Sequence, residues 1–338
     1  MVIKENFSLK PFHTFATPAF ARYFAEVQSL DKLRELLSDP LLKKHNHLLL
    51  GAGSNVLFKN DFPGVVIKLS IMGREVLKSG SGIIRLRVNA GEDWDQLVAY
   101  CVENNWGGME NLSLIPGNVG TSPMQNIGAY GVELKDFFHE LKALELSTGK
   151  IRTFNKKECR FGYRDSFFKK EGKGKYIILS VTFNLTENHH RINTSYGALE
   201  AELKSMGVTN PEIGHIRKAV CNIRRSKLPD PALLGNAGSF FKNPVVTEKK
   251  FRELKGSFPG MVAYPDTKGM KLAAGWLIEN TGWKGYRKGD AGVHQKQALV
   301  LVNHGNANGK EITRLAEKIK KSVQEKFGVE LETEVNIV

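Results

Sequence analysis

Apolar residues recur along this chain with two different periods, and the two periods separate helices from strands. Where they recur three and four positions apart, the pattern predicts amphipathic helices. Ser29 and Asp93 precede the first two of these segments, and both residue types cap helix N-termini. The expected helices cover residues 29–37, 93–102, 211–226, 247–255, 271–280 and 310–327.

Strands are expected where apolar and polar residues alternate or where a short apolar run is bounded by turn residues. These segments are residues 47–50, 65–69, 83–89, 141–154 (a hairpin turning at 147–150), 176–185 and 298–302. The chain closes on residues 328–338, whose alternation places Glu330, Glu332, Glu334 and Asn336 on one face. Because strands and helices alternate without a regular β-α-β order, the predicted fold class is α+β.

Length and charge narrow the functional class. A chain of 338 residues is long enough for two or three domains with real cores. The formal net charge is +14 with a pI of about 9.5, which favours an anionic partner: nucleic acid, an acidic membrane surface or a phosphorylated small molecule. The cations are scattered, and the sequence has no recognisable nucleic-acid-binding motif.

Cysteine usage and the N-terminal sequence indicate a cytoplasmic protein. Cys101, Cys159 and Cys221 are far apart and form no CxxC, so they are expected to be buried thiols rather than disulfides or zinc ligands. The N-terminal residues lack the apolar run of a signal peptide, and no segment has the length of a membrane span. We expect no metal site.

Residues 107–131, GGMENLSLIPGNVGTSPMQNIGAYG, combine glycines with amide and hydroxyl side chains and contain no Lys, Arg or Asp. Glycine permits positive φ and close backbone approach, so consecutive N–H groups can converge on an anion. Tight turns between strands are the ordinary alternative. Gly51-Ala52-Gly53-Ser54-Asn55 is a second possible anion-binding turn. It is not a dinucleotide fingerprint of the Rossmann type, since Val56 follows and no helical pattern begins there.

Three further segments combine reactive groups with special backbone. Arg160 and Arg164 flank a glycine and can anchor a carboxylate, although a solvated turn is the commoner explanation. Ser239 lies between a glycine turn and two phenylalanines, where a helix N-cap is the ordinary alternative; Gly-x-Ser-x-Gly is absent. The glutamates of the last strand become functional only if that strand folds back onto a ligand site.

The order of these segments is more specific than any one of them. The chain contains, in succession, GAGSNVL, IPGNVGTSPMQNIGAYG, RFGYRDS, SYG, KLPDP, NAGSFFKNP, KLAAGWLIE and LETEV. This succession resembles the UDP-N-acetylenolpyruvoylglucosamine reductases, the MurB flavoenzymes of peptidoglycan precursor synthesis, from about Leu9 to Val335. The element Ser195-Tyr196-Gly197 is similar to the tyrosine loop of the longer, type I branch of that family.

The resemblance implies a fold and a domain division. It implies a two-part FAD-binding domain of the vanillyl-alcohol-oxidase (PCMH) type and a smaller α+β substrate-binding domain. On this basis residues 1–70 form the first FAD-binding subdomain and residues 71–229 the second, to which the strand 329–338 returns. Residues 230–328 form the substrate-binding domain.

The cofactors implied by the resemblance are FAD and NADPH. The family's flavin contacts fall here on Gly51, Gly53, Ser54, Asn55, Val56, Leu57, Pro116, Gly117, Gly120, Thr121, Ser122, Gln125, Asn126, Gly128, Ala129, Tyr130 and Gly131. Its contacts with the UDP-sugar or NADPH fall on Tyr196, Lys227, Asn243, Tyr264, Lys271, Lys284 and Gln297.

The implied reaction reduces UDP-N-acetylglucosamine enolpyruvate to UDP-N-acetylmuramate. NADPH reduces the flavin, hydride then passes from flavin N5 to substrate C3, and Ser239 gives a proton to C2. Arg164 and Glu334 flank the enolpyruvyl group, and Arg164 can stabilise the charge that develops on its carboxylate. Lysines that meet pyrophosphates give the positive net charge a use other than nucleic-acid binding.

Two alternatives remain open, and a few residues depart from the family pattern. An oxidase on the same flavin fold is one alternative; a non-enzymatic protein that binds nucleic acid or a nucleotide sugar is the other, but it leaves the glycine loops unused. His13 and Ala16 stand where the family often has Asn and Gly, Asn118 replaces a small or thiol residue, and Thr333 replaces a proline. We expect a monomer without nucleic-acid or membrane partners.

Overall fold

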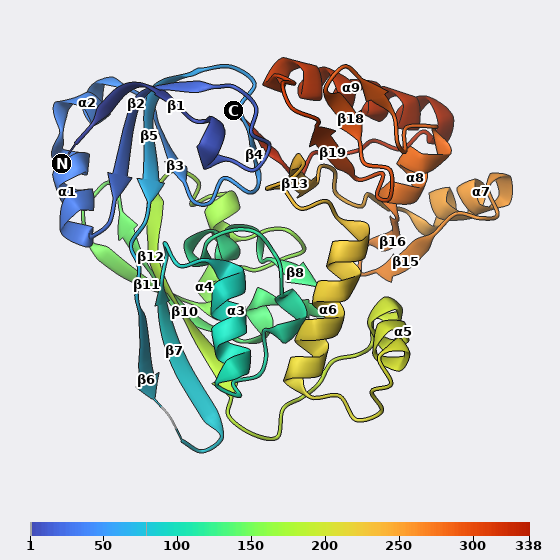
Figure 1. Cartoon of the computed structure of the whole chain (residues 1–338), viewed down its shortest axis with the longest axis horizontal. Coiled ribbons are helices and arrows are strands. Elements are labelled where there is room, and N and C mark those ends of the chain that lie inside the picture. The colour runs from blue at the N-terminus through green and yellow to red at the C-terminus, as the bar shows by residue number, and fades with distance from the viewer. Residues whose placement is uncertain (1, 79) are drawn as a thin grey trace. The chain divides into compact units, whose positions relative to one another are not determined.

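The computed structural model describes residues 2–78 and 80–338, and the chain forms two compact units (Figure 1). Unit 1 contains Met1–Glu5, Tyr23–Ala52 and Pro63–Ser226, and unit 2 contains Asn6–Arg22, Gly53–Phe62 and Lys227–Val338. Each unit therefore gathers segments that are distant in the sequence.

The first sheet, most of which belongs to unit 1, has the strand order β1-β2-β5-β3. Its strands are β1 (Lys4–Ser8), β2 (Phe20–Val27), β3 (His47–Leu50) and β5 (Phe62–Leu69). β3 and β5 run parallel, with Leu50 opposite Lys68. The helices α1 (Leu30–Ser38) and α2 (Pro40–Lys44) precede β3, and the Ser29 side chain caps α1 by accepting from the Lys32 N–H at 3.2 Å.

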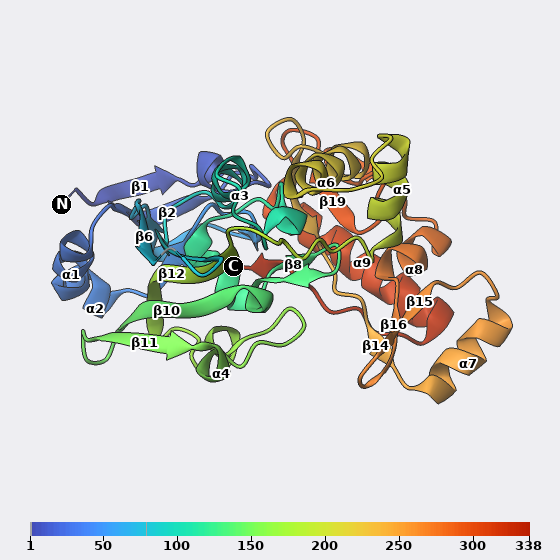
Figure 2. The ribbon, with the colours of Figure 1, turned by 90° about the horizontal axis from the view of Figure 1, so that it is seen from below.

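The second sheet of unit 1 is antiparallel, with the order β11-β10-β12-β7-β6. Its strands are β6 (Arg74–Lys78), β7 (Ile83–Asn89), β10 (Phe138–Glu145), β11 (Ile151–Asn155) and β12 (Tyr176–Thr186). Helix α3 (Trp94–Glu103) begins at the cap Asp93 and buries Trp94 and Leu97 in the same core as the inner strands. Short α4 (Lys156–Cys159) lies beside β11, as Figure 2 shows.

Two helices complete unit 1. α5 (Gly197–Ser205) and α6 (Ile213–Lys227) share a small apolar core. Arg217 of α6 donates to both carboxylate oxygens of Asp95, at 2.6 and 3.1 Å, and Asp95 also accepts from the Leu114 N–H at 2.6 Å. This bidentate pair fixes α6 against α3 and the loop that follows it.

Unit 2 has two small antiparallel sheets and three helices. The sheets have the orders β13-β19-β18-β17 and β14-β16-β15. Their strands are β13 (Gly235–Ser239), β14 (Val245–Val246), β15 (Ala263–Asp266), β16 (Gly269–Leu272), β17 (Arg287–Lys288), β18 (Ala291–Val293) and β19 (Val300–Asn303). The helices are α7 (Glu248–Ser257), α8 (Ala274–Asn280) and α9 (Gly309–Phe327).

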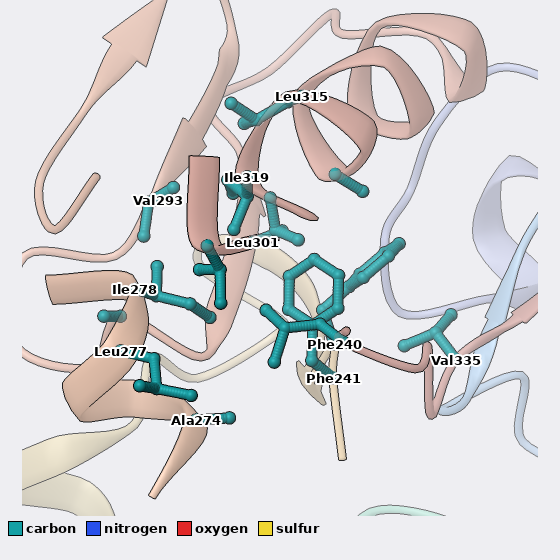
Figure 3. Packing of buried hydrophobic residues seen from close by; sticks show 14 of the residues in the cluster. Phe240, Phe241, Ala274, Leu277, Ile278, Val293, Leu301, Leu315, Ile319 and Val335 are labelled. Atoms are coloured by element: carbon teal, nitrogen blue, oxygen red, sulfur yellow. The ribbon is translucent and has the colours of Figure 1, made fainter. Parts of the chain in front are cut away.

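One apolar core holds unit 2 together. Figure 3 shows side chains of α8, α9, β18 and β19 meeting Phe240 and Phe241, which directly follow β13. The predicted inward positions of α9 are all buried, among them Ile312, Ile319 and Phe327. The capping box formed by Asn308 and Glu311 sets the start of this helix.

The C-terminal segment differs from the expectation of one continuous strand returning to residues 71–229. Only β20 (Asn336–Ile337) is a strand, and it pairs in parallel with β4 (Val56–Leu57). Thr333 forms an isolated bridge with Phe241, and the whole segment belongs to unit 2. The alternation of apolar and polar residues does mark buried positions, since Val329, Leu331 and Val335 are buried. These side chains pack in the core of unit 2.

The α+β class and most of the predicted elements are confirmed. The helix expected at 271–280 begins only at Ala274, because 269–272 pairs with β15 as a strand. Elements without a prediction include β1, β2, α2, β6 and α5, the short α4, and the short strands of unit 2 from β13 to β18. The cysteines are free and buried, and burial raises the pKa of Cys101 and of Cys159 to about 12. Within residues 2–78 and 80–338 no helix has the length and apolarity to cross a membrane, and no cluster of metal-ligating side chains occurs.

Ile319 tests the core of unit 2. It is fully buried in α9, so Ile319→Ala should lower the free energy of unfolding by about 2–5 kcal/mol. The neighbouring exposed Lys318→Ala is the control and should change it by less than about 0.5 kcal/mol. Urea unfolding followed by circular dichroism measures both. Equal effects of the two substitutions would contradict the packing of α9.

Candidate active site

The Gly51 turn follows β3 in unit 1 and presents backbone donors. Within the described chain, the N–H groups of Gly51 and Ala52 donate to no acceptor. The carbonyl oxygen of Gly51, in contrast, accepts from Lys68 Nζ at 2.8 Å. A turn with consecutive unused N–H groups can bind an anion, so the anion-binding role of this turn stays a prediction.

The glycine-rich segment 107–131 packs closely against its neighbours in unit 1. It forms the short 3₁₀ helices η2 (Glu110–Leu112) and η3 (Val119–Gln125) and the strands β8 (Gly128–Ala129) and β9 (Val132–Glu133). A Cβ on Gly120 would lie 2.4 Å from the Cβ of Ala90, and one on Gly51 would lie 2.6 Å from Thr121 Cγ2. The two glycine-rich segments therefore lie side by side, and neither position has room for a larger residue.

Several polar side chains of this segment bind its own backbone. Ser122 Oγ donates to the Val119 carbonyl at 2.7 Å, and Thr121 Oγ1 donates to the Asn118 carbonyl at 2.8 Å. Asn126 donates to the Gly162 carbonyl at 3.1 Å and accepts from the Lys135 N–H at 3.0 Å. These hydrogen bonds fix the shape of the loop.

Asn118, a departure from the family pattern, has a structural role. Its Nδ2 donates to the carbonyls of Gly91 at 2.7 Å and Glu92 at 3.3 Å, just after β7. Its backbone pairs with Asp93, the cap of α3. Asn118 therefore fastens the Pro116-Gly117 turn to the end of β7 and the start of α3.

The turn that carries Arg164 is held against the glycine-rich segment. Gly162 and Asp165 exchange two backbone hydrogen bonds, of 3.0 and 3.3 Å, and Arg164 between them has φ of 52°. Ser166 Oγ donates to the Met124 carbonyl at 2.7 Å. Lys169 Nζ donates to the Arg164 carbonyl at 3.1 Å and to Gln125 Oε1 at 3.2 Å. A partly buried guanidinium is thus placed by a loop that has little freedom.

Tyr196 lies at the start of α5 and contacts the same segment. Its ring meets the ring of Tyr130 edge-on, with centroids 5.3 Å apart. Asn111 Nδ2 donates to the carbonyls of Tyr130 and Asn193, both at 3.0 Å, and so joins the segment that precedes Tyr196 to the glycine-rich segment. Unit 1 therefore brings the two glycine-rich segments, Arg164 and Tyr196 into one connected network.

Ser239 is the last residue of β13 in unit 2, just after an irregularity in the strand. The register with β19 shifts between Asn236 and Ser239, and Gly238 has φ of 67°. Such a bulge re-aims the side chain that follows it. Among the described residues, Ser239 Oγ has no hydrogen-bond partner, and the side chain is only partly buried. The hydroxyl is therefore available to a ligand and does not cap a helix.

Glu334 lies beside this serine segment. Its N–H donates to the Phe240 carbonyl at 2.8 Å, and Lys242 N–H donates to the Glu332 carbonyl at 2.9 Å. The bridge between Phe241 and Thr333 lies between these two bonds, and Thr333 N–H takes part in neither. Proline differs from threonine in having no N–H to donate, and neither of these bonds uses the N–H of residue 333. The two bonds that position Glu334 can therefore form with either residue.

Most of the predicted substrate-binding residues gather near the start of α8. Asn243 Oδ1 accepts from the Ala274 N–H at 2.9 Å, and Gln297 Oε1 lies 3.1 Å from the position of a Cβ on Gly275. Tyr264 and Lys271 are opposite each other in β15 and β16. Figure 2 shows these strands beside α7. Two predicted lysines lie outside this group: Lys227 ends α6, and Lys284 follows α8, where it pairs with Glu279 at 2.8 Å.

Comparisons with known proteins agree with this arrangement. Residues 21–155 match an FAD binding domain, and residues 230–338 match the UDP-N-acetylenolpyruvoylglucosamine reductase, C-terminal domain. The chain is 49% identical to the UDP-N-acetylenolpyruvoylglucosamine reductase of Pseudomonas putida, over 99% of this chain and 98% of that protein. It is 46% identical to the reductase of Flavobacterium johnsoniae, over 100% of both. The chain belongs to the UDP-N-acetylenolpyruvoylglucosamine reductase family.

A solved structure supports the fold. The UDP-N-acetylenolpyruvylglucosamine reductase of Thermus caldophilus has a TM-score of 0.70 to this chain at 24% identity, covering 100% of this chain and 99% of the other. The family resemblance expected from the sequence is thus confirmed, and so is the FAD-binding domain. The individual site residues and the tyrosine-loop branch stay predictions.

The residues present in unit 1 fit a flavin dinucleotide. The unused N–H groups of Gly51 and Ala52 suit the pyrophosphate, because backbone donors can approach an anion closely only at small residues. The glycine-rich residues 116–131 lie beside this turn and inside the matched FAD-binding domain. Lys68, which contacts the Gly51 turn, was not among the predicted site residues. Its position as the one charged residue of the apolar strand VVIKL could have indicated it.

Gly120→Ala tests the close approach of the two segments. The new Cβ would overlap Ala90, so the substitution should destabilise the protein by about 1–3 kcal/mol and weaken FAD retention. Gly214→Ala in α6 is the matched control: a Cβ there meets nothing within 4 Å, so the substitution should keep FAD retention and should not lower stability. Thermal unfolding and the flavin absorbance of the purified protein measure the two effects. Normal FAD retention in Gly120→Ala would contradict the geometry.

Proposed function

We propose that this protein reduces UDP-N-acetylglucosamine enolpyruvate to UDP-N-acetylmuramate with NADPH, using bound FAD, in peptidoglycan precursor synthesis. Full-length identity of 46% and 49% to two reductases of this name supports the activity. The observation that carries the proposal is the position of Ser239. Its hydroxyl has no hydrogen-bond partner among the described residues, and the next residue, Phe240, accepts a backbone hydrogen bond from Glu334.

Bound FAD supplies a group that accepts hydride from NADPH and donates it to C3 of the substrate. Ser239 then gives its proton to C2. A serine hydroxyl is a weak acid, but the enediolate formed on the substrate is a strong base, so a well-placed neutral hydroxyl is sufficient. The bulge before Ser239 and the buried Phe240 and Phe241 after it hold that hydroxyl in place.

Arg164 stabilises the negative charge that develops on the substrate carboxylate. A guanidinium binds a carboxylate through two parallel hydrogen bonds, and a fixed donor needs little reorganisation during the reaction. The Gly162–Asp165 bonds and Lys169 supply that fixation. Glu334 orients the enolpyruvyl carboxylate or shares a proton with it, from a backbone position set by its bond to Phe240.

The cations of unit 2 bind the phosphates of the substrate and of NADPH. Lys271 and Tyr264 face each other across two strands next to α8, where Asn243 and Gln297 also lie. Part of the net charge of +14 would then serve to bind a nucleotide sugar rather than a nucleic acid. Because UDP-sugars and NADPH are metabolites of the cytoplasm, we place the protein there.

Ser239→Ala separates the two halves of the reaction. We expect flavin reduction by NADPH to stay within a few-fold of the wild type, since no proton is transferred to C2 in that half. Reoxidation of the reduced protein by substrate should slow by about 10²–10⁴-fold, the usual contribution of general acid catalysis. Anaerobic stopped-flow absorbance measures both. Ser257→Ala, on an exposed position of α7, is the control and should change neither.

Two results would count against this proposal. Equal slowing of both half-reactions in Ser239→Ala would remove the proton-donor role of Ser239. Rapid reoxidation of the reduced wild-type protein by O₂, together with no response to the enolpyruvyl substrate, would favour an oxidase on the same fold.

A further inference from the structure

Lys68 is a lysine in an unusual place. It lies in β5 among buried neighbours, and its partly buried ammonium donates to the Gly51 carbonyl at 2.8 Å. Among the described residues no carboxylate lies within ion-pair distance of it; Glu26, which adds a favourable field, binds Ser70 Oγ instead. Burial lowers the pKa of Lys68. Burying the charged ammonium of Lys68 costs desolvation free energy, and among the described residues no paired carboxylate offsets that cost.

The hydrogen bond to Gly51 determines the direction of the next N–H group. The peptide between Gly51 and Ala52 is trans, as are all peptide bonds among the described residues. In a planar trans peptide the C=O and N–H groups point in opposite directions. Because Lys68 holds the Gly51 carbonyl on one side, the Ala52 N–H points away on the other side, where none of the described residues accepts from it.

The same bond also strengthens that donor. A cation at a carbonyl oxygen polarises the peptide, so its N–H becomes a better hydrogen-bond donor, as in other chains of hydrogen bonds. The positive charge itself raises the electrostatic potential at the turn, which favours a bound anion. Lys68 therefore favours an anion bound to the Gly51 turn without touching it.

We propose that Lys68 is a positioning residue for the diphosphate of the cofactor: it orients and polarises the Gly51–Ala52 peptide whose N–H binds that diphosphate. The inference rests on the proposed function in that FAD is the anion concerned. FAD is favoured over the UDP-sugar because the Gly51 turn and Lys68 both lie in the FAD-binding domain, residues 21–155.

The test compares substitutions of Lys68 in the flavin-free protein reloaded with FAD. Lys68→Met removes the charge and keeps the length of the side chain, and it should weaken FAD binding by about tenfold to a hundredfold, the effect of losing a hydrogen bond to a charged group. Lys68→Arg keeps charge and donors and should restore most of the affinity, and Lys68→Gln should give an intermediate value. Lys157→Met, exposed on α4 in the same unit, makes the same change in net charge and should have no effect.

Riboflavin and ADP, each of which contains part of FAD, show which part of the cofactor Lys68 acts on. Flavin fluorescence measures the dissociation constant of FAD and of riboflavin, and competition with FAD measures that of ADP. If Lys68 acts on the diphosphate, Lys68→Met loses affinity for FAD and ADP but keeps that for riboflavin. A loss for riboflavin as large as that for FAD, or no loss for ADP, overturns the proposal.

Other outcomes are equally decisive. Wild-type affinity for FAD in Lys68→Met, or a loss in Lys68→Arg as large as in Lys68→Met, shows that the ammonium does not position the diphosphate. If Lys68→Met does not fold by circular dichroism, the comparison of Lys68→Gln with Lys68→Arg carries the same test. A wild-type protein that binds no FAD would instead refute the proposed function itself.

Discussion

The close approach of backbone segments at Gly120 is the constraint on which unit 1 depends. Because a Cβ at Gly120 would lie 2.4 Å from that of Ala90, η3 can pack against the end of β7 only with glycine there. Asn118 fastens the same place through its bonds to Gly91 and Glu92. Beside this packed loop, the N–H groups of Gly51 and Ala52 have no acceptor among the described residues.

The backbone pairings of their segments position the residues that we propose to be catalytic. Arg164 is placed by a turn that Asn126 and Lys169 connect to the glycine-rich segment. In unit 2 the bonds between residues 240–242 and 332–334 bring Glu334 beside the strand that ends in Ser239. Functional groups positioned by a rigid scaffold are a common arrangement at binding sites.

Local patterns predicted the elements well and their partners poorly. Ser29 and Asp93 each mark a helix start because capping is a property of a few neighbouring residues. The C-terminal alternation predicted buried residues but not that unit 2 would bury them, since pairing partners are set by distant parts of the chain. The hydrogen bonds of Asn126 and Ser122 to distant and local carbonyls were not predicted for the same reason: the sequence does not show which backbone acceptor a side chain meets. Only the order of motifs, read as a family resemblance, linked Ser239, Arg164 and Glu334.

Isotope tracing in the product tests the central claim most directly. The purified protein is given UDP-N-acetylglucosamine enolpyruvate with NADPH that carries deuterium in the transferred position, and separately in heavy water with ordinary NADPH. The account predicts UDP-N-acetylmuramate with deuterium at C2 in heavy water, because Ser239 delivers an exchangeable proton. Deuterium from NADPH reaches C3 only where hydride transfer to the substrate is faster than exchange of the flavin-bound hydrogen with solvent. Oxidation of NADPH without formation of this product, or label from heavy water missing at C2, would contradict it.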